Sequence, residues 1–240
     1  ELYINGIRVG EDCFTPGWTD YTKRVYYKTY EVSSLLNHGE NTVGVILADG
    51  WYAGNIANRG QYYYGKRLRF KMQLEIAKSS GAVDVIATNN TWRASYGPIR
   101  EADMQGGETY DARLKMNGWN TNDFDDSQWK DVVVSDSITT PLQPYPSLGV
   151  RKTEEIKPVE IVKRNSGTYI VDMGQNFAGW VRLKVSGSKG DSIVLRYAEK
   201  LNEKGALYTR NLRTARATDT YVVGNDGSEV WAPRFTYHGF

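Results

Sequence analysis

The chain has 240 residues, of which 40% are hydrophobic and 12% aromatic, enough to fill the core of one large domain or two smaller ones. Its 30 lysines and arginines nearly balance its 28 aspartates and glutamates, and the net charge of +2 gives no electrostatic reason to expect nucleic acid or a membrane surface as a partner. The single cysteine, Cys13, excludes an intramolecular disulfide framework and any metal site built from several cysteines.

The first residues, "ELYING", are typical of a strand and carry neither a starting methionine nor a signal-peptide pattern. The last residues, "PRFTYHGF", also stop within a predicted strand. No apolar run is long enough to span a membrane. We therefore expect a fragment of a longer protein, whose compartment these features do not decide.

Short strands are predicted along the whole chain. The piece "EVSSLLNHGEN" (31–41) predicts one or two helical turns that end at Gly39 and lead into a strand, "TVGVIL". The run "RFKMQLEI" (69–76) alternates apolar and polar residues, as do "VRLKV" (181–185) and "SIVLRYAE" (192–199), which is the period of half-buried antiparallel strands. Because no long helical period occurs, the sequence predicts a nearly all-β protein.

Strand alternation lapses over residues 134–160, where four of the seven prolines lie. A stretch of this kind is typical of a domain boundary. We predict a first domain over residues 1–140, a linker over 141–156 and a second domain over 157–240. The first is long enough for a jelly roll of two packed sheets, and the second for most of a smaller antiparallel sandwich.

Catalytic groups are hard to find in this sequence. His38 lies beside the Gly39 turn, and His238 has no recognisable partner, so we expect both to be structural. The carboxylate pair Asp125–Asp126 lies in "NDFDDSQW", which is typical of a capped turn, and Glu154–Glu155 lies in the linker. Neither pair predicts an acid and base, and we assign no catalytic residue.

Aromatic residues beside polar ones in three predicted loops are the stronger signal, because sugars bind to flat aromatic faces and to planar amides or carboxylates. We expect carbohydrate contacts from Trp18, Asp20, Asp49, Trp51, Asn58, Glu108 and Tyr110. The alternative is that the Trp and Tyr side chains simply plug the ends of a β-sandwich. Only a fold that brings the loops to one end would make them a single site.

The stretch "VDMGQNFAGWVRLKVSG" (171–187) places a polar corner before a strand. Gly174 and Gly179 would permit a tight turn, and the amides of Gln175 and Asn176 could satisfy unpaired backbone groups. On this interpretation, the role of the corner is architectural. The alternative is that Asn176 and Trp180 face a sugar or a further domain.

Long motifs in this chain resemble those of bacterial α-L-rhamnosidases, glycoside hydrolase family 78. The segments "PGWTDYTKRVYYKTYEVSSLLNHGENTVGVILADGWYAG" and "TWRASYGPIREADMQGGETYDAR" resemble the family's N-terminal domain, and "GTYIVDMGQNFAGWVRLKVSG" with the residues after it resembles the following β-sandwich domain. The resemblance implies an all-β fold of two β-sandwich domains, the first a galactose-binding-like jelly roll and the second a smaller antiparallel sandwich truncated at its C-terminus.

Family members resemble one another in hydrolysing terminal α-L-rhamnose with inversion, using two carboxylates on a helical barrel that follows these domains. That barrel is absent here, so the resemblance implies a non-catalytic accessory region whose partners are a rhamnose-containing glycoside and the barrel of the parent chain. The alternative is a purely structural scaffold for that barrel. A bacterial parent that is periplasmic or secreted is favoured over a cytoplasmic one.

The first domain also resembles carbohydrate-binding module family 67, whose members can hold rhamnose through calcium. No cofactor is required by the sequence itself, but the resemblance allows a calcium ion. Calcium binds several oxygen ligands. The local candidates are Asp20, Asp49, Asn55, Asn58 and Asp111.

Overall fold

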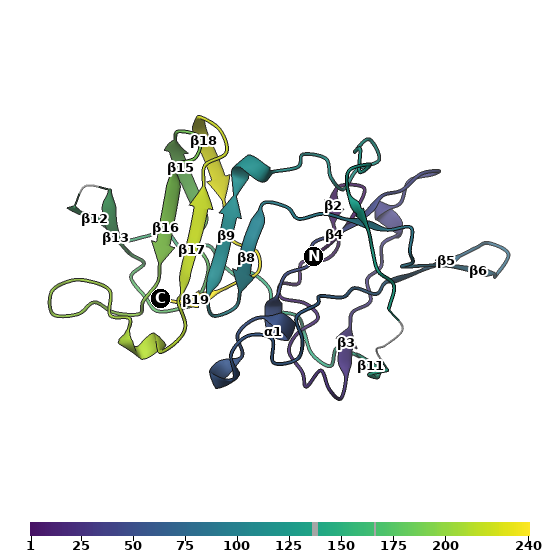
Figure 1. Ribbon diagram of the computed structural model, residues 1–240, viewed down its shortest axis with the longest axis horizontal. Helices are drawn as coiled ribbons and strands as arrows, with labels where there is room; N and C mark the ends of the chain where they lie inside the picture. The colour runs from purple at the N-terminus through teal and green to yellow at the C-terminus, as the bar shows by residue number, and fades with distance from the viewer. Residues whose placement is uncertain (136–138, 166) are drawn as a thin grey trace.

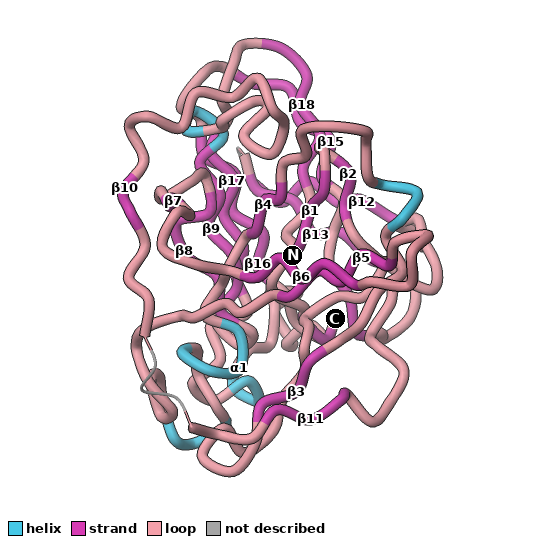
Figure 2. The backbone as a smooth tube through the Cα atoms, turned by 90° about the vertical axis from the view of Figure 1, so that its right-hand side faces the viewer, coloured by secondary structure: helices cyan, strands magenta, loops and turns pink. Residues whose placement is uncertain are grey.

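The computed structural model describes residues 1–135, 139–165 and 167–240. Residues 136–138, close to the end of the predicted first domain, lie outside them. In this part of the chain the structure is nearly all β, as predicted (Figure 1). Figure 2 shows that loops connect the strands and that the helices are short. They are η1 (Ser33–Leu35), α1 (Gly50–Ala53), η2 (Ala57–Arg59), η3 (Ala112–Leu114) and η4 (Arg210–Leu212).

The N-terminal region, residues 1–140, forms small sheets and hairpins. A three-stranded antiparallel sheet has the order β2-β1-β4, and β5 pairs with β6, β7 with β10. Strand β3 pairs in parallel with β11 of the connecting segment, residues 141–156. The bounds are β1 (Leu2–Ile4), β2 (Ile7–Arg8), β3 (Val25–Tyr27), β4 (Val43–Val45), β5 (Gln73–Ala77), β6 (Val83–Ala87), β7 (Arg93–Ala94), β10 (Lys130–Asp131) and β11 (Leu142–Pro144).

A four-stranded sheet joins this region to the C-terminal region, residues 157–240 (Figure 1). Its order is β16-β17-β9-β8, and β9 pairs in parallel with β17 through Thr109 opposite Thr220. The bounds are β8 (Ile99–Asp103), β9 (Gly107–Asp111), β16 (Ser192–Arg196) and β17 (Thr218–Val222). Backbone pairing therefore crosses the predicted linker, and the division into two domains stays a prediction.

The main core lies between this sheet and the antiparallel pair β15 and β18. Tyr221, Val223 and Trp231 are buried there, and the half-buried apolar residues that pack on them are Tyr110, Ala112, Leu183, Val185, Ile193 and Leu195. The alternation of the sequence supplies these inward faces. The remaining strands are β12 (Glu160–Asn165), β13 (Thr168–Asp172), β14 (Ala178–Gly179), β15 (Leu183–Gly187), β18 (Gly227–Trp231) and β19 (His238–Gly239).

Buried polar side chains fix the junction between the two regions. Asp219 accepts hydrogen bonds from the backbone N–H of Glu108 at 2.8 Å and from the Tyr197 hydroxyl at 2.7 Å, and it lies 3.0 Å from Nε2 of His238. The His238 ring also stacks on Tyr197, with centroids 4.2 Å apart. His238 is therefore structural, as predicted, but it has in Asp219 a partner that sequence reasoning missed.

Turns and short helices show which local predictions were right and which were wrong. The 3-10 helix η1 confirms the short helical piece before β4, but it ends at Leu35 and not at Gly39. Ser127 donates its backbone N–H to Asp125, which confirms the capped turn. The loop that contains Trp51 holds α1, a short helix that the sequence did not indicate. At the corner after β13, Gly174 has φ of +78° and donates its N–H to Asp172, a residue that the sequence reasoning did not use.

No helix in the described part of the chain is both long and apolar enough to cross a membrane.

Candidate binding site

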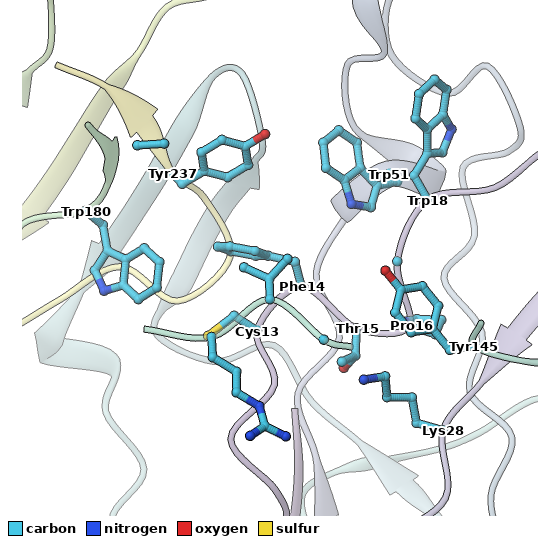
Figure 3. Close-up of a pocket in the computed structure, with 15 residues that line it drawn as sticks. Cys13, Phe14, Thr15, Pro16, Trp18, Lys28, Trp51, Tyr145, Trp180 and Tyr237 are labelled. Atoms are coloured by element: carbon cyan, nitrogen blue, oxygen red, sulfur yellow. The ribbon is translucent and has the colours of Figure 1, made fainter. Parts of the chain in front are cut away.

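A cavity of about 500 Å³ opens where the N-terminal region, the connecting segment and the C-terminal region meet (Figure 3). Aromatic side chains make up much of its wall. The lining residues are Cys13, Phe14, Thr15, Pro16, Gly17, Trp18, Lys28, Trp51, Tyr145, Gly149, Val150, Arg151, Ala178, Trp180 and Tyr237. Three parts of the sequence thus contribute to one site.

Two tryptophans form one wall of the cavity. Trp51 lies in α1 and Trp18 in the loop after Gly17, and their rings stack with centroids 6.0 Å apart and planes inclined by 27°. Trp18 keeps 54% of its surface exposed, so an apolar face remains open to a ligand. A flat, exposed indole is the kind of surface on which the C–H face of a sugar ring packs.

The position of Trp18 depends on Gly17. This glycine has φ of +98°, and a Cβ added to it would lie 2.7 Å from the ring of Tyr145. Both the left-handed backbone and the close approach of the ring require glycine here. The connecting segment, through Tyr145, therefore packs directly behind the turn that presents Trp18.

The opposite wall brings the C-terminal region against Phe14 (Figure 3). Trp180 meets the Phe14 ring edge to face at 5.9 Å, and Tyr237 lies 5.5 Å from the same ring. Phe14 has φ of +55°, an unusual conformation for a bulky residue, so its backbone is held strained in this position. The polar corner was interpreted either as architectural or as facing a site. The contact with Phe14 favours a site-facing role for Trp180, whereas Asn176 does not line the cavity.

Two cations, Lys28 and Arg151, form the polar edge of the cavity. Nζ of Lys28 lies 2.7 Å from Asp12 and 4.9 Å from the centre of the Tyr145 ring, and Nε of Arg151 lies 3.3 Å from the other oxygen of Asp12. The hydrogen bond from Lys28, followed by that from Arg151, lowers the pKa of Asp12 below its usual value. The Asp12 side chain is only 6% exposed and does not line the cavity, so the described lining residues include basic groups but no acidic one.

Trp18 and Trp51 are the predicted sugar-binding residues that line the cavity. Asp20, two residues beyond Trp18, accepts hydrogen bonds from the backbone and hydroxyl of Thr22. Asp49 precedes α1, where burial and then the charges of Asp103 and Glu101 raise its pKa. Asn58 is exposed in η2. These three polar residues belong to the same loops as the tryptophans but do not line the cavity.

Glu108 and Tyr110 lie on β9, away from the cavity. Glu108 is fully buried, and its carboxylate accepts hydrogen bonds from the backbone N–H groups of Arg234 and Phe235 at 2.9 and 3.1 Å. The second oxygen is buried and has no partner among the residues that the structure describes. Burial raises the pKa of Glu108 to about 7. Tyr110 stacks on Tyr221 in the core. The structure therefore does not bring these two residues to the aromatic cavity.

The acidic calcium candidates, Asp20, Asp49 and Asp111, do not form one metal-binding cluster among the described residues. Within the described residues, no group of three or more acidic, histidine or cysteine side chains is placed to hold a metal ion. Asp111 is already paired with Arg113, at 2.7 Å, and Asn55 donates both its backbone and side-chain N–H to Asp103. Asp20 accepts two hydrogen bonds from Thr22, and Asn58 is exposed in η2.

The two carboxylate pairs considered for catalysis are held in surface interactions. Asp126 pairs with Arg93 at 3.4 Å, and Glu155 with both Lys152 and Arg182 at 2.9 Å. A glycosidase needs an acid and a base that face each other across a bound sugar. Neither pair lines the aromatic cavity.

Comparison with protein families gives two matches. Residues 1–154 match the family model described as the α-L-rhamnosidase N-terminal domain, and residues 162–240 match the bacterial α-L-rhamnosidase concanavalin-like domain. The division between the two matches falls next to the predicted linker.

Among curated proteins, the whole chain is 44% identical to an α-L-rhamnosidase of Streptomyces avermitilis and 39% identical to one of Alteromonas sp., of which it covers 23% and 26%. The crystal structure of the Streptomyces avermitilis enzyme complexed with L-rhamnose matches the whole chain with a TM-score of 0.95 and 44% identity, over 23% of its length. The α-L-rhamnosidase structure from Aspergillus terreus matches with a TM-score of 0.90 and 36% identity, over 28% of its length. The chain thus spans about a quarter of these relatives.

Proposed function

This chain belongs to the α-L-rhamnosidase family through its N-terminal domain, and on that basis we propose that it is a non-catalytic accessory region that binds carbohydrate for such an enzyme. The parent enzyme would hydrolyse terminal α-L-rhamnose from glycosides with inversion. Its catalytic barrel would be the second partner of this region. We extend the proposal to a periplasmic or secreted parent in a bacterium.

The observation that carries carbohydrate binding is the Trp18–Trp51 wall of the cavity. Both tryptophans come from loops whose composition predicts sugar contacts, and the fold brings their rings together beside an open cavity. Most pockets for small ligands combine apolar walls with a few polar groups, and here Lys28, Tyr145 and Arg151 supply the polar groups. A sugar ring packed on the indoles could direct its hydroxyls to these side chains.

A scaffold without a ligand of its own is the second candidate function. The observation in its favour is the buried contact between Glu108 of the N-terminal region and Asp219, Arg234 and Phe235 of the C-terminal region. Such contacts would hold the two regions as one rigid support for a catalytic domain.

Ligand-observed NMR with L-rhamnose separates the two functions. We expect saturation transfer from the wild-type chain to L-rhamnose and its loss in Trp51→Ala, with the circular dichroism spectrum unchanged. Absence of transfer to the folded wild-type chain would support the scaffold. In the same preparations, we expect no release of p-nitrophenol from its α-L-rhamnoside, and measurable release would contradict a non-catalytic role.

A further inference from the structure

We propose that the cavity selects an acidic sugar, one that carries a carboxylate, as in a uronic acid. This inference rests on the proposed function, because it concerns the ligand of the same cavity. It starts from the charged side chains there. The described lining contains Lys28 and Arg151 and no aspartate or glutamate.

Two cations, Lys28 and Arg151, lie beside one buried carboxylate, so one positive charge becomes available to a ligand once the exposed Glu11 is displaced. Lys28 and Arg151 share the carboxylate of Asp12, which lies behind the cavity wall with its side chain 6% exposed. The remaining acidic neighbour is Glu11, which lies 3.9 Å from Nη1 of Arg151 with its side chain 85% exposed. A contact of that length between two largely exposed side chains contributes little, so Glu11 can be displaced by a ligand.

Arg151 is the group that would meet the ligand. Its side chain is 56% exposed, whereas that of Lys28 is 14% exposed and is held between Asp12 and the Tyr145 ring. Only the Nε of Arg151 faces Asp12 closely, at 3.3 Å, which leaves its terminal N–H groups for a further acceptor. A guanidinium binds a carboxylate through two parallel hydrogen bonds, and this geometry favours a carboxylate over a hydroxyl.

The aromatic walls define the rest of this ligand. The Trp18–Trp51 stack offers a flat face to a pyranose ring, and Phe14 and Trp180 close the opposite side. Neutral sugars are usually held by carboxylate and amide acceptors for their hydroxyls, and this lining has neither. Aromatic faces beside the half-exposed guanidinium of Arg151 fit an anionic saccharide better than a neutral one.

Methyl α-D-glucuronide and methyl α-D-glucoside form a matched pair of probes, because they differ in a carboxylate against a hydroxymethyl group. We expect the chain to bind the glucuronide about tenfold more tightly at low salt, with the preference falling as salt is added. In Arg151→Gln the preference for the glucuronide should disappear. Arg182 is an exposed arginine outside the cavity, and in Arg182→Gln the preference should persist. Circular dichroism checks that both variants fold.

Three outcomes would overturn the inference. If L-rhamnose binds and the glucuronide binds no more tightly than the glucoside, the proposed function stands and the acidic ligand is excluded. If no sugar binds the folded chain, both the function and the inference fail. If the 6-sulfate of the glucoside binds and the glucuronide does not, the cavity selects a sulfate ester and not a carboxylate.

Discussion

The carboxylate of Glu108, on β9, accepts a 2.9 Å hydrogen bond from the backbone N–H of Arg234, a residue of the C-terminal region. Among the described residues, only one of the two carboxylate oxygens finds hydrogen-bond partners, and the side chain is fully buried. A buried carboxylate with an unpaired oxygen is costly in its charged form. Glu108 therefore couples the contact between the two regions to pH.

The stability contributed by Glu108 should depend on pH. Burial raises its pKa from 4.5 to about 7, with the Asp219 charge acting in the same direction and Arg234 against it. Because the folded chain holds this proton more tightly than the unfolded chain, the contribution is full below about pH 4.5 and is lost as pH rises through about 7. We expect the free energy of unfolding of wild type to fall by roughly 3 kcal/mol across this window. Glu108→Gln should not show this fall.

Urea unfolding at several pH values measures this effect as the difference between wild type and Glu108→Gln. The exposed residue Glu75 provides the control, and Glu75→Gln should run parallel to wild type. A constant difference between wild type and Glu108→Gln across the window would contradict the raised pKa.

The Tyr197 hydroxyl should stabilise the fold through Asp219. In Tyr197→Phe, one oxygen of the buried Asp219 loses its 2.7 Å hydrogen bond, and an unsatisfied buried group costs about 1 to 3 kcal/mol. We expect a loss of that size in the free energy of unfolding. The same change at Tyr169, which is 54% exposed, should cost less than about 0.5 kcal/mol. Equal losses in the two variants would contradict the role given to the hydroxyl.

Gly17 should be required for the sugar site as well as for stability. Gly17→Ala places a Cβ 2.7 Å from Tyr145 at φ of +98°, so we expect a loss of about 1 to 3 kcal/mol and a displaced Trp18 that binds L-rhamnose more weakly. Gly39 has a similar φ of +88° but open space around it. Gly39→Ala should therefore cost about 1 kcal/mol and leave the affinity for L-rhamnose unchanged. If both variants bind equally well, the Gly17 turn does not position the site.

Chelation tests the calcium that the family resemblance suggests. Because Asp20, Asp49 and Asp111 do not form a metal-binding group in the described structure, we expect EDTA to change neither the melting temperature nor the affinity for L-rhamnose. Affinity that is lost in EDTA and restored by calcium would show that oxygen ligands gather in a way that this structure does not contain.

Much of the fold could be predicted because strand alternation is a local property of the sequence. The half-buried faces of β5, β15 and β16 follow directly from the spacing of their apolar residues. The parallel pairing of β9 with β17 could not be predicted, since it joins segments on either side of the linker and leaves no local pattern. That pairing also buries Glu108, although the glycines before it predict an exposed loop.

The cavity could be predicted only in part, for the same reason. Trp18 and Trp51 stand out because each lies in a loop rich in glycine and polar residues. For Trp180, the glycine-flanked corner indicated a site-facing role as one of two interpretations. Lys28, Arg151 and Tyr237 gave no signal. Lys28 directly follows an ordinary strand, Arg151 lies in the linker and Tyr237 in the terminal sequence, so each becomes a site residue through tertiary contacts.

Calorimetric titration of the 240-residue chain with L-rhamnose, repeated for Trp18→Ala, tests most directly whether the cavity binds sugar. Tyr96→Ala is the matched control, because this aromatic residue is 92% exposed and does not line the cavity. We predict binding heat for wild type and Tyr96→Ala and its loss in Trp18→Ala. Binding that is equally strong in all three proteins, or absent from the folded wild-type chain, would contradict it.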